Sequence, residues 1–175
     1  VVLRELLQYA DTAREVKRLL HTEEIFVDGK RVKDPKRIVG LFDVITIPKV
    51  KEAYRMHLTK QGKAAMMKVE DAHLKPCKII GKTMVRGKLQ LNLHDSNNII
   101  VDKNLYRVGD SVALSLPKHE ISKHLPLGKK STIFLIGGKH TGELGIVQDV
   151  QKDKIIYKDI EGNLIETSKE YVFVI

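Results

Sequence analysis

The chain has 175 residues, of which 42% are hydrophobic, which suffices for one ordinary domain or for two to three small ones. Its net charge of +9 favours a polyanionic partner, either nucleic acid or an acidic membrane surface, although a soluble basic protein without such a partner has the same signature. The single cysteine, Cys77, excludes an intramolecular disulfide and suits a reducing cytoplasm. No run of residues is long and apolar enough to span a bilayer.

Residues 1–50 are expected to fold as helices followed by strands. The apolar residues of VVLRELLQYA have helical spacing, which predicts a first helix. Thr12 and Glu15 form a capping-box pattern that begins a second helix, TAREVKRLL. IFVDGKRV then predicts a strand, a tight turn at Asp28-Gly29 and the start of another strand. DVITIPKV predicts one more strand, with Pro48 near its end.

Residues 51–125 begin with a polar, basic stretch and continue as short apolar runs interrupted by Gly, Asn and Asp. The runs CKIIGKTMV, KLQLNLHD, NIIVD and YRVGDSVALSL predict the strands of a small all-β unit. This part of the chain holds 14 Lys and Arg against 7 Asp and Glu, which is most of the excess positive charge.

Residues 126–175 read as a small barrel. STIFLIGG, GIVQDV, KIIYKD, LIETS and YVFVI are strand-like runs separated by regular turn signals, which predicts about five strands. The charges of this part balance, with seven Lys and Arg against seven Asp and Glu. Electrostatic attraction to a polyanion is therefore expected to come mainly from the rest of the chain.

The segment 137–147, GGKHTGELGIV, contains glycines close to a lysine and a threonine, as phosphate-binding loops do. In a P-loop, Lys and Ser or Thr directly follow the last glycine, because the lysine reaches the terminal phosphates and the hydroxyl holds Mg²⁺. Glu143 and Leu144 stand there instead, and a strand-like run follows rather than a helix. The segment is therefore predicted to be a hairpin turn, in which Gly138 and Gly142 permit positive φ and Gly145 permits a close backbone approach or a bulge.

Two segments resemble known RNA-associated modules. TAREVKRLLHTEEIFVDGKRVKDPKRIV followed by FDVITI resembles the S-four-type RNA-binding domain, which occurs in ribosomal proteins, pseudouridine synthases and tyrosyl-tRNA synthetases. The run from Lys130 to Val147 resembles a KOW motif, the loop-bearing segment of an SH3-like barrel in ribosomal proteins and transcription elongation factors. The matching KOW positions are Gly137, Gly138, Lys139, Gly142, Gly145, Ile146 and Val147.

With the basic middle between them, these segments make the whole chain resemble the archaeal and eukaryotic small-subunit ribosomal proteins of the S-four-e type. The resemblance implies an α+β chain of three parts: a small two-helix and strand RNA-binding domain at 1–50, a basic β-rich central domain at 51–125, and a C-terminal SH3-like KOW barrel at 126–175. Members of that family carry a basic segment before the first helix and often a longer tail after the barrel. Neither lies within these 175 residues, a length that suits an archaeal member better than a eukaryotic one.

The resemblance also implies what the chain binds. The expected partners are small-subunit rRNA and neighbouring ribosomal proteins in the cytoplasmic ribosome, with no membrane and no small-molecule substrate. Two other functions stay open on the residues alone. One is a transcription or translation factor that docks a protein partner through its KOW barrel, against which the basic middle argues. The other is a fragment of an RNA-modifying enzyme, which would need a catalytic module that these residues do not contain.

Candidate RNA-binding residues are cations, because affinity for folded RNA comes first from Lys and Arg that displace counterions from phosphates. Arg14, Lys17 and Arg18 fall on one face of the helix expected at 12–20. The hairpin after Gly29, the loop beyond it, the basic turn of the middle part and the KOW loop supply the other candidates: Lys30, Arg31, Lys33, Lys36, Arg37, Arg86, Lys88 and Lys139. Weaker candidates in the middle part are Arg55, Lys60, Lys63 and Lys82, and His140 accompanies Lys139 at the KOW tip.

Each of these surfaces has an alternative explanation without RNA. The N-terminal cations form a plain solvated face if Glu23, Glu24 and Asp34 neutralise them. The alternative for the KOW loop is a plain surface hairpin that contacts no RNA. The scarcity of aromatic residues favours recognition of RNA shape and backbone over base stacking. Three aromatic residues are accordingly assigned to cores and strands: Tyr54, Tyr106 and Phe134.

No catalytic residue, metal site or cofactor is predicted. The seven histidines are scattered, and none has a metal-ligand spacing with Cys77, which follows Pro76 in an apolar run and reads as a buried small hydrophobic residue. Asp28 lies in the V-D-G turn. In the pseudouridine synthases the catalytic aspartate lies in a separate domain, which is missing here.

Overall fold

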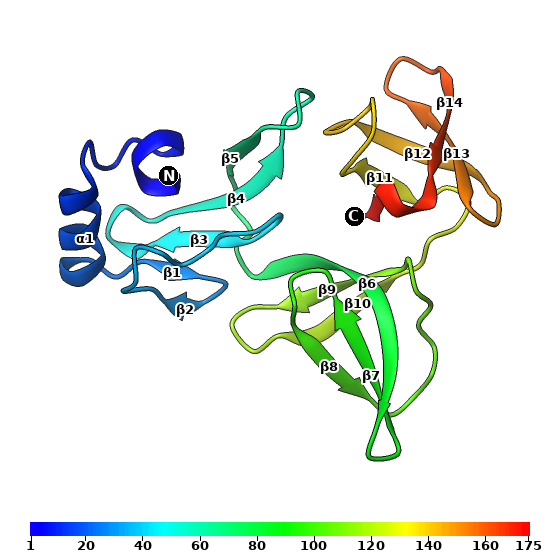
Figure 1. Cartoon of the computed structure of the whole chain (residues 1–175), viewed down its shortest axis with the longest axis horizontal. Coiled ribbons are helices and arrows are strands. Elements are labelled where there is room, and N and C mark those ends of the chain that lie inside the picture. Colours follow the sequence, from blue (N-terminus) through cyan, green and yellow to red (C-terminus); the bar gives the residue numbers. More distant parts are fainter. The chain divides into compact units, whose positions relative to one another are not determined.

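The computed structural model describes all residues, 1–175, and consists mostly of β-strands (Figure 1). There are three five-stranded sheets, with the strand orders β2-β1-β3-β4-β5, β10-β9-β6-β7-β8 and β14-β13-β12-β11-β15. The chain divides into two compact units. The first comprises residues 1–57, 64–75 and 115–120, and the second comprises 58–63, 76–114 and 121–175. None of the helices has the length and apolar character that a membrane crossing requires.

The first unit begins with a single π-helical turn, Val2–Leu6, followed by the helix α1, Ala13–Thr22. The first helix is therefore shorter than predicted. Gln8, two residues after its end, has a φ of 55°, which is not helical. The capping box of α1 is confirmed: Thr12 Oγ1 accepts the Glu15 N–H at 3.2 Å, and the Glu15 carboxylate accepts the Thr12 N–H at 3.3 Å. These bonds satisfy N–H groups that have no partner within the helix.

The first sheet contains β1 (Phe26–Val27), β2 (Lys30–Arg31), β3 (Val44–Ile47), β4 (Glu52–Leu58) and β5 (Ala64–Lys68). A 3-10 turn at Pro48–Val50 ends β3, as the proline predicts. The sequence analysis described residues 51–68 only as part of a polar, basic stretch. Here β4 pairs with β3 and the sheet continues to β5, so the first sheet extends beyond residue 50.

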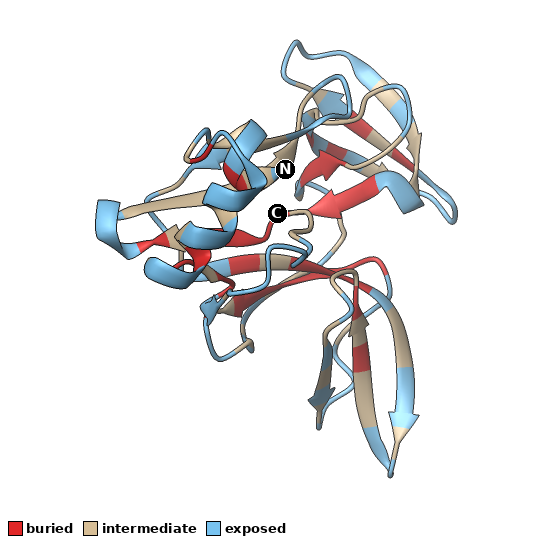
Figure 2. Ribbon diagram, turned by 60° about the vertical axis from the view of Figure 1, so that its left-hand side comes forward, coloured by how far each residue is buried: buried red, intermediate tan, exposed pale blue.

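The core of the first unit lies between this sheet and the helical turns (Figure 2). The sheet and the residue before β1 contribute four buried side chains: Ile25, Val27, Ile45 and Ile47. Leu20 of α1 is buried against them. Leu3, Val16 and Leu19 pack against the same cluster, which gives α1 the inward face that its apolar spacing predicts.

The second sheet contains β6 (Leu74–Val85), β7 (Lys88–Leu93), β8 (Asn98–Val101), β9 (Ser111–Ser115) and β10 (Glu120–Leu125). The first four coincide with predicted runs, whereas β10 was not predicted. Cys77 is fully buried in the core of this sheet, beside Ile79, Leu91 and Leu114, which confirms its prediction as a small hydrophobic residue.

The third sheet contains β11 (Thr132–Leu135), β12 (Leu144–Val150), β13 (Lys154–Asp159), β14 (Leu164–Ser168) and β15 (Val172–Val174). Its five strands match the predicted number. Gly138 and Gly142 have φ values of 78° and 81°. A Cβ on Gly145 would lie 2.3 Å from the ring of the buried Tyr157, so the close approach predicted at this glycine is confirmed.

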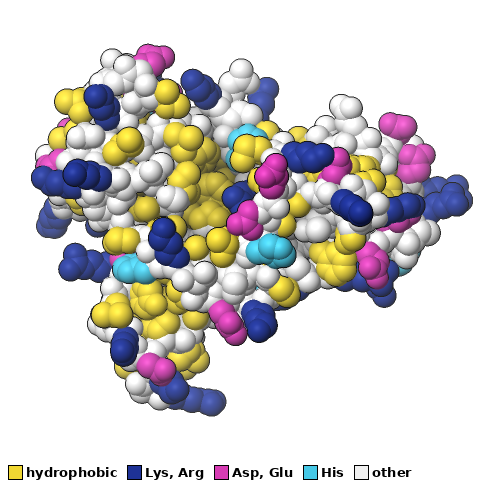
Figure 3. Space-filling view, turned by 180° about the vertical axis from the view of Figure 1, so that it is seen from behind, with side chains coloured by type: hydrophobic (Ala, Val, Ile, Leu, Met, Phe, Trp, Pro, Cys, Tyr) yellow, Lys and Arg dark blue, Asp and Glu magenta, His cyan; other side chains and the backbone are white.

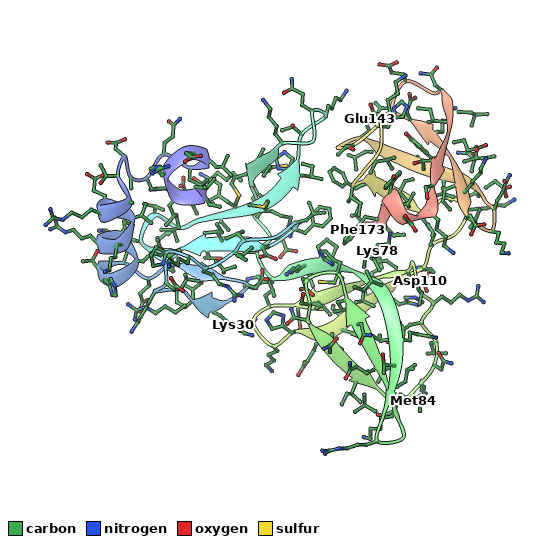
Figure 4. The ribbon with its side chains drawn as sticks, in the orientation of Figure 1. Lys30, Lys78, Met84, Asp110, Glu143 and Phe173 are labelled. Carbon is green, nitrogen blue, oxygen red and sulfur yellow. The ribbon has the colours of Figure 1, made fainter.

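Hydrogen bonds and a ring contact connect the second and third sheets within the second unit (Figure 4). The Lys78 ammonium donates to the carbonyl of Glu170 at 2.8 Å, and burial lowers the pKa of this amine. The His94 ring meets the Phe173 ring edge-on, with 5.0 Å between centroids. Asp110 accepts the Leu127 N–H at 2.9 Å, which fixes the start of the segment leading to the third sheet.

Candidate RNA interface

One face of α1 carries cations whose nearby acids are engaged elsewhere. Arg14, Lys17 and Arg18 are all exposed and recur at positions three and four apart, as predicted. Glu15, the acid within this stretch, accepts the backbone N–H groups of Asp11 and Thr12, which lower the pKa of its carboxyl. The three cations therefore project into solvent with their charge uncompensated by an ion pair.

The acids that could have neutralised this region have other partners. Glu23 pairs with Lys49 at 2.6 Å, and Glu24 lies 3.8 Å from Arg31. Asp34 Oδ1 accepts the backbone N–H of Lys36 at 2.8 Å, which shapes the loop and leaves the Lys36 side chain exposed. Of the N-terminal candidates, only Arg31 is partly neutralised by an acid.

The hairpin and the loop beyond it present the remaining cations of the first unit. Lys30 and Arg31 form β2 and are both exposed, and Figure 4 shows Lys30 at the turn end of the hairpin. The exposed residues of the following loop are Lys33, Lys36 and Arg37. We call the eight residues on α1, β2 and this loop the N-terminal cations: Arg14, Lys17, Arg18, Lys30, Arg31, Lys33, Lys36 and Arg37.

A buried ion triad holds this hairpin in place. Lys75 Nζ lies 2.7 Å from Asp28 Oδ2 and 2.6 Å from Asp43 Oδ1, and the Lys75 side chain is only 1% exposed. Asp28 Oδ1 also accepts the Val44 N–H at 2.9 Å. Burial, followed by the charge of Asp43, raises the pKa of the Asp28 carboxyl. The triad connects the β1–β2 turn to β3 and to the start of β6, and so fixes the strand that presents Lys30.

The turn itself requires glycine. Asp28 and Gly29 both have positive φ, at 50° and 75°. A Cβ on Gly29 would lie 2.4 Å from the Cβ of Pro117, in the segment 115–120 of the same unit. The close approach of two chain segments therefore explains Gly29, and the contacts with Lys75 and the Val44 N–H give Asp28 a structural role.

The β6–β7 hairpin of the second unit has a basic tip. Arg86 and Gly87, with φ values of 50° and 78°, form the turn between β6 and β7, as predicted. Arg86 is exposed and without an ion pair, whereas Lys88 lies 3.5 Å from Asp102. Figure 4 shows Met84 beside this tip, where its side chain is 66% exposed.

Several weaker candidates have structural partners instead. Lys82 Nζ donates to Asn104 Oδ1 and to the carbonyl of Tyr106. The Arg55 guanidinium donates to the carbonyl oxygens of Asp71 and Leu74. Both side chains are thus held by neutral groups of the chain, whereas Lys60 and Lys63 are exposed at the β4–β5 turn.

The predicted KOW loop joins β11 and β12. Lys139 is exposed there, while the His140 ring contacts the Glu143 carboxylate at 3.0 Å. His140 therefore already has an acidic neighbour, whereas Lys139 has no ion pair and stays the candidate of this loop. Tyr54 and Tyr106 are half-buried and Phe134 is buried, in agreement with their assignment to cores and strands.

The fold also brings together three side chains whose sequence spacing gave no signal. Potential ligand atoms of Cys77, His94 and Asp95 lie within 4.8 Å of one another. His94 Nδ1 accepts the Lys78 N–H at 3.2 Å, and Asp95 accepts both the backbone and the side-chain N–H groups of Asn97. These bonds hold the turn between β7 and β8, and they leave the imidazole lone pair at Nδ1 already engaged.

Comparison with known proteins assigns the chain to a family. The sequence profile described as ribosomal family S4e matches residues 50–121. Small ribosomal subunit protein eS4 of Methanocella arvoryzae is 41% identical over 182 residues, an alignment that covers the whole of this chain and 77% of the relative. The chain belongs to ribosomal family S4e. The eS4 protein of Methanocaldococcus jannaschii is 33% identical over 189 residues, covering all of this chain and 78% of that protein.

A solved member of the S4e family has the same fold. The crystal structure of the 30S ribosomal protein S4e from Thermoplasma acidophilum superposes with a TM-score of 0.84 at 31% identity, over 99% of this chain and 91% of that one. The predicted S-four-e resemblance is therefore confirmed. The predominance of β-structure with few helices agrees with this match.

Proposed function

We propose that the chain is a structural constituent of the small ribosomal subunit that binds rRNA through the N-terminal cations. The relatives that cover the whole chain at 33–41% identity are small ribosomal subunit proteins. The single observation that supports this choice of surface is the availability of its cations. Seven of the eight lack an acidic partner, and the nearby carboxylates are engaged by backbone groups or by Lys49 and Arg31 (Figure 3, dark blue side chains at the right).

Recognition is expected to depend on the RNA backbone and its shape. Unpaired Lys and Arg on a short helix, a hairpin and a loop neutralise phosphates and release counterions. The tyrosines of the first unit are not free to stack on bases, because Tyr9 and Tyr54 both donate to the Glu52 carboxylate at 2.6 Å. Arg86 and Lys139 are proposed as secondary contacts from the second unit, and Lys88 contributes less because of Asp102.

The three-part organisation is proposed with the same boundaries as before: an S-four-type domain at 1–50, a central basic domain at 51–125 and an SH3-like KOW barrel at 126–175. The strands β4 and β5 lie beyond residue 50 but continue the sheet of the first domain. The partners are small-subunit rRNA and neighbouring ribosomal proteins, within the cytoplasmic ribosome.

Membership of a ribosomal protein family confirms that the chain is not an enzyme. The alternative of an RNA-modifying enzyme fragment is therefore wrong. The alternative of a transcription or translation factor that docks a partner through the KOW loop finds no support in the relatives that cover the whole chain, which are small ribosomal subunit proteins.

Charge reversal on α1 tests this proposal in assembled subunits. The triple variant Arg14→Glu, Lys17→Glu, Arg18→Glu is mixed with an equal amount of the unchanged chain during reconstitution of small subunits from rRNA and total protein. We expect the variant to occupy at most about a tenth of the subunits, because three phosphate contacts become repulsive. Quantitative mass spectrometry of purified subunits measures the ratio.

The matched control reverses three exposed cations of the second unit: Lys103→Glu, Lys123→Glu and Lys152→Glu. It has the same net charge as the α1 variant and is expected to compete nearly as well as the unchanged chain. Equal incorporation of the α1 variant and the unchanged chain would contradict the proposed interface.

A further inference from the structure

The outer face of the third sheet carries apolar side chains that nothing in the chain covers. One face of β12 and β13 forms the core with Val147, Ile155 and Tyr157. On the opposite face, Ile146 lies across from Lys158, and Lys158 lies across from Leu164. Ile146 is 49% exposed and Leu164 is 70% exposed. Figure 3 shows hydrophobic side chains on the surface of this part of the molecule, at the upper left.

A pocket of about 400 Å³ opens beside this face. Its apolar lining comes from Leu144, Ile160 and Ile165. Gly142 stands in one wall, where a Cβ would lie 2.3 Å from the carbonyl oxygen of Thr59, so the β4–β5 turn is held tightly against the β11–β12 loop. All of these residues belong to the second unit, so the pocket is part of one compact body.

The rim of the pocket is acidic. Glu143, Asp159 and Glu161 line it, and Figure 4 shows Glu143 on the β11–β12 loop. The only Lys or Arg in the lining is Lys60. Asn163 donates to both carboxylate oxygens of Asp159, at 2.8 and 3.0 Å, and these bonds lower the pKa of the Asp159 carboxyl.

We propose that this pocket and the adjoining face, formed by Leu144, Ile146, Ile160 and Leu164, bind a basic, extended segment of a neighbouring ribosomal protein that inserts an apolar side chain. An acidic rim repels RNA phosphates and attracts Lys and Arg, so it selects protein over rRNA at this site. The apolar floor supplies the burial that anchors one side chain of such a segment. The inference rests on the proposed function and names the partner class of a surface of the second unit.

Cross-linking from Ile160, an exposed residue that lines the pocket, tests the inference. Ile160 is 81% exposed, and Cys77, the natural cysteine, is fully buried. The variant Ile160→Cys is therefore labelled selectively with a benzophenone maleimide, assembled into small subunits and irradiated. We expect a covalent adduct with a different ribosomal protein, within a peptide rich in Lys and Arg. An adduct with rRNA, an adduct with a second copy of this chain, or no protein adduct would each overturn the inference.

A charge-reversed version of the labelled variant separates docking from mere proximity. Adding Glu143→Lys and Glu161→Lys is expected to reduce the protein adduct by about tenfold, because like charges then face the partner. Unchanged adduct yield would also overturn the inference. Incorporation into subunits is measured for the labelled and the unlabelled Ile160→Cys chains: normal incorporation with no protein adduct rejects only the docking site, whereas failed incorporation of the unlabelled chain rejects the proposed function and the docking site with it.

Discussion

Replacing Lys75 with alanine is expected to lower the free energy of unfolding of the first unit by about 3–5 kcal/mol. The ammonium lies between Asp28 Oδ2 and Asp43 Oδ1 at 2.7 and 2.6 Å, and it is almost completely buried. Its removal leaves two carboxylates in a buried site without the cation that compensates them. Because Asp28 also holds the Val44 N–H, the loss should open the β1–β2 turn and loosen β3.

Hydrogen exchange of the Val44 amide measures this effect locally, which avoids treating the whole chain as one two-state transition. We expect exchange at least about a hundredfold faster in Lys75→Ala, since about 1.4 kcal/mol corresponds to a factor of ten. Lys49→Ala serves as the matched control, because Lys49 forms an ion pair of similar length with Glu23 but is 69% exposed. Exposed pairs contribute about 1 kcal/mol or less. Similar protection loss in the two variants would show that burial of the triad carries no special weight.

Neutralising the α1 cations is expected to change the salt dependence of rRNA binding. The logarithm of the affinity falls linearly with the logarithm of the salt concentration, with a slope of roughly 0.7–0.9 per neutralised phosphate. The variant Arg14→Ala, Lys17→Ala, Arg18→Ala should therefore show a slope that is shallower by roughly 2–3. Its affinity at low salt should fall, because fewer counterions are released. Filter binding to transcribed small-subunit rRNA over a salt series gives both quantities.

The control for this series is Lys103→Ala, Lys123→Ala, Lys152→Ala, which removes the same charge from exposed positions of the second unit. Its slope should equal that of the unchanged chain. If both triples lower the slope equally, binding depends on overall charge, and α1 makes no specific phosphate contact.

Local patterns predicted most of the strands and the helix that presents the cations. The T-A-R-E capping box located the start of α1, and the V-D-G sequence located the β1–β2 turn, because both depend on residues close in sequence. The turn at Arg86-Gly87 was found for the same reason. These are the features that position the proposed RNA-binding side chains.

Contacts between distant residues were not predictable in this way. The stretch 51–68 looked polar because β4 is half-buried along most of its length and β5 is exposed at both ends. Only the pairing of β4 with β3, and the position of β5 beside β4, show that both strands extend the first sheet. Lys75 gave no signal because its two acidic partners are 32 and 47 positions away. The Cys77, His94 and Asp95 cluster was missed for the same reason.

Directed cleavage of rRNA tests the placement of α1 most directly. The variant His21→Cys carries an exposed thiol one helical turn beyond Arg18, and the buried Cys77 does not compete for the reagent. Small subunits assembled with an iron–EDTA group tethered at position 21 should show rRNA strand breaks at a few discrete sites, absent from subunits with untethered reagent. Breaks no stronger than that background would mean that α1 faces away from rRNA, and the proposed interface would be wrong.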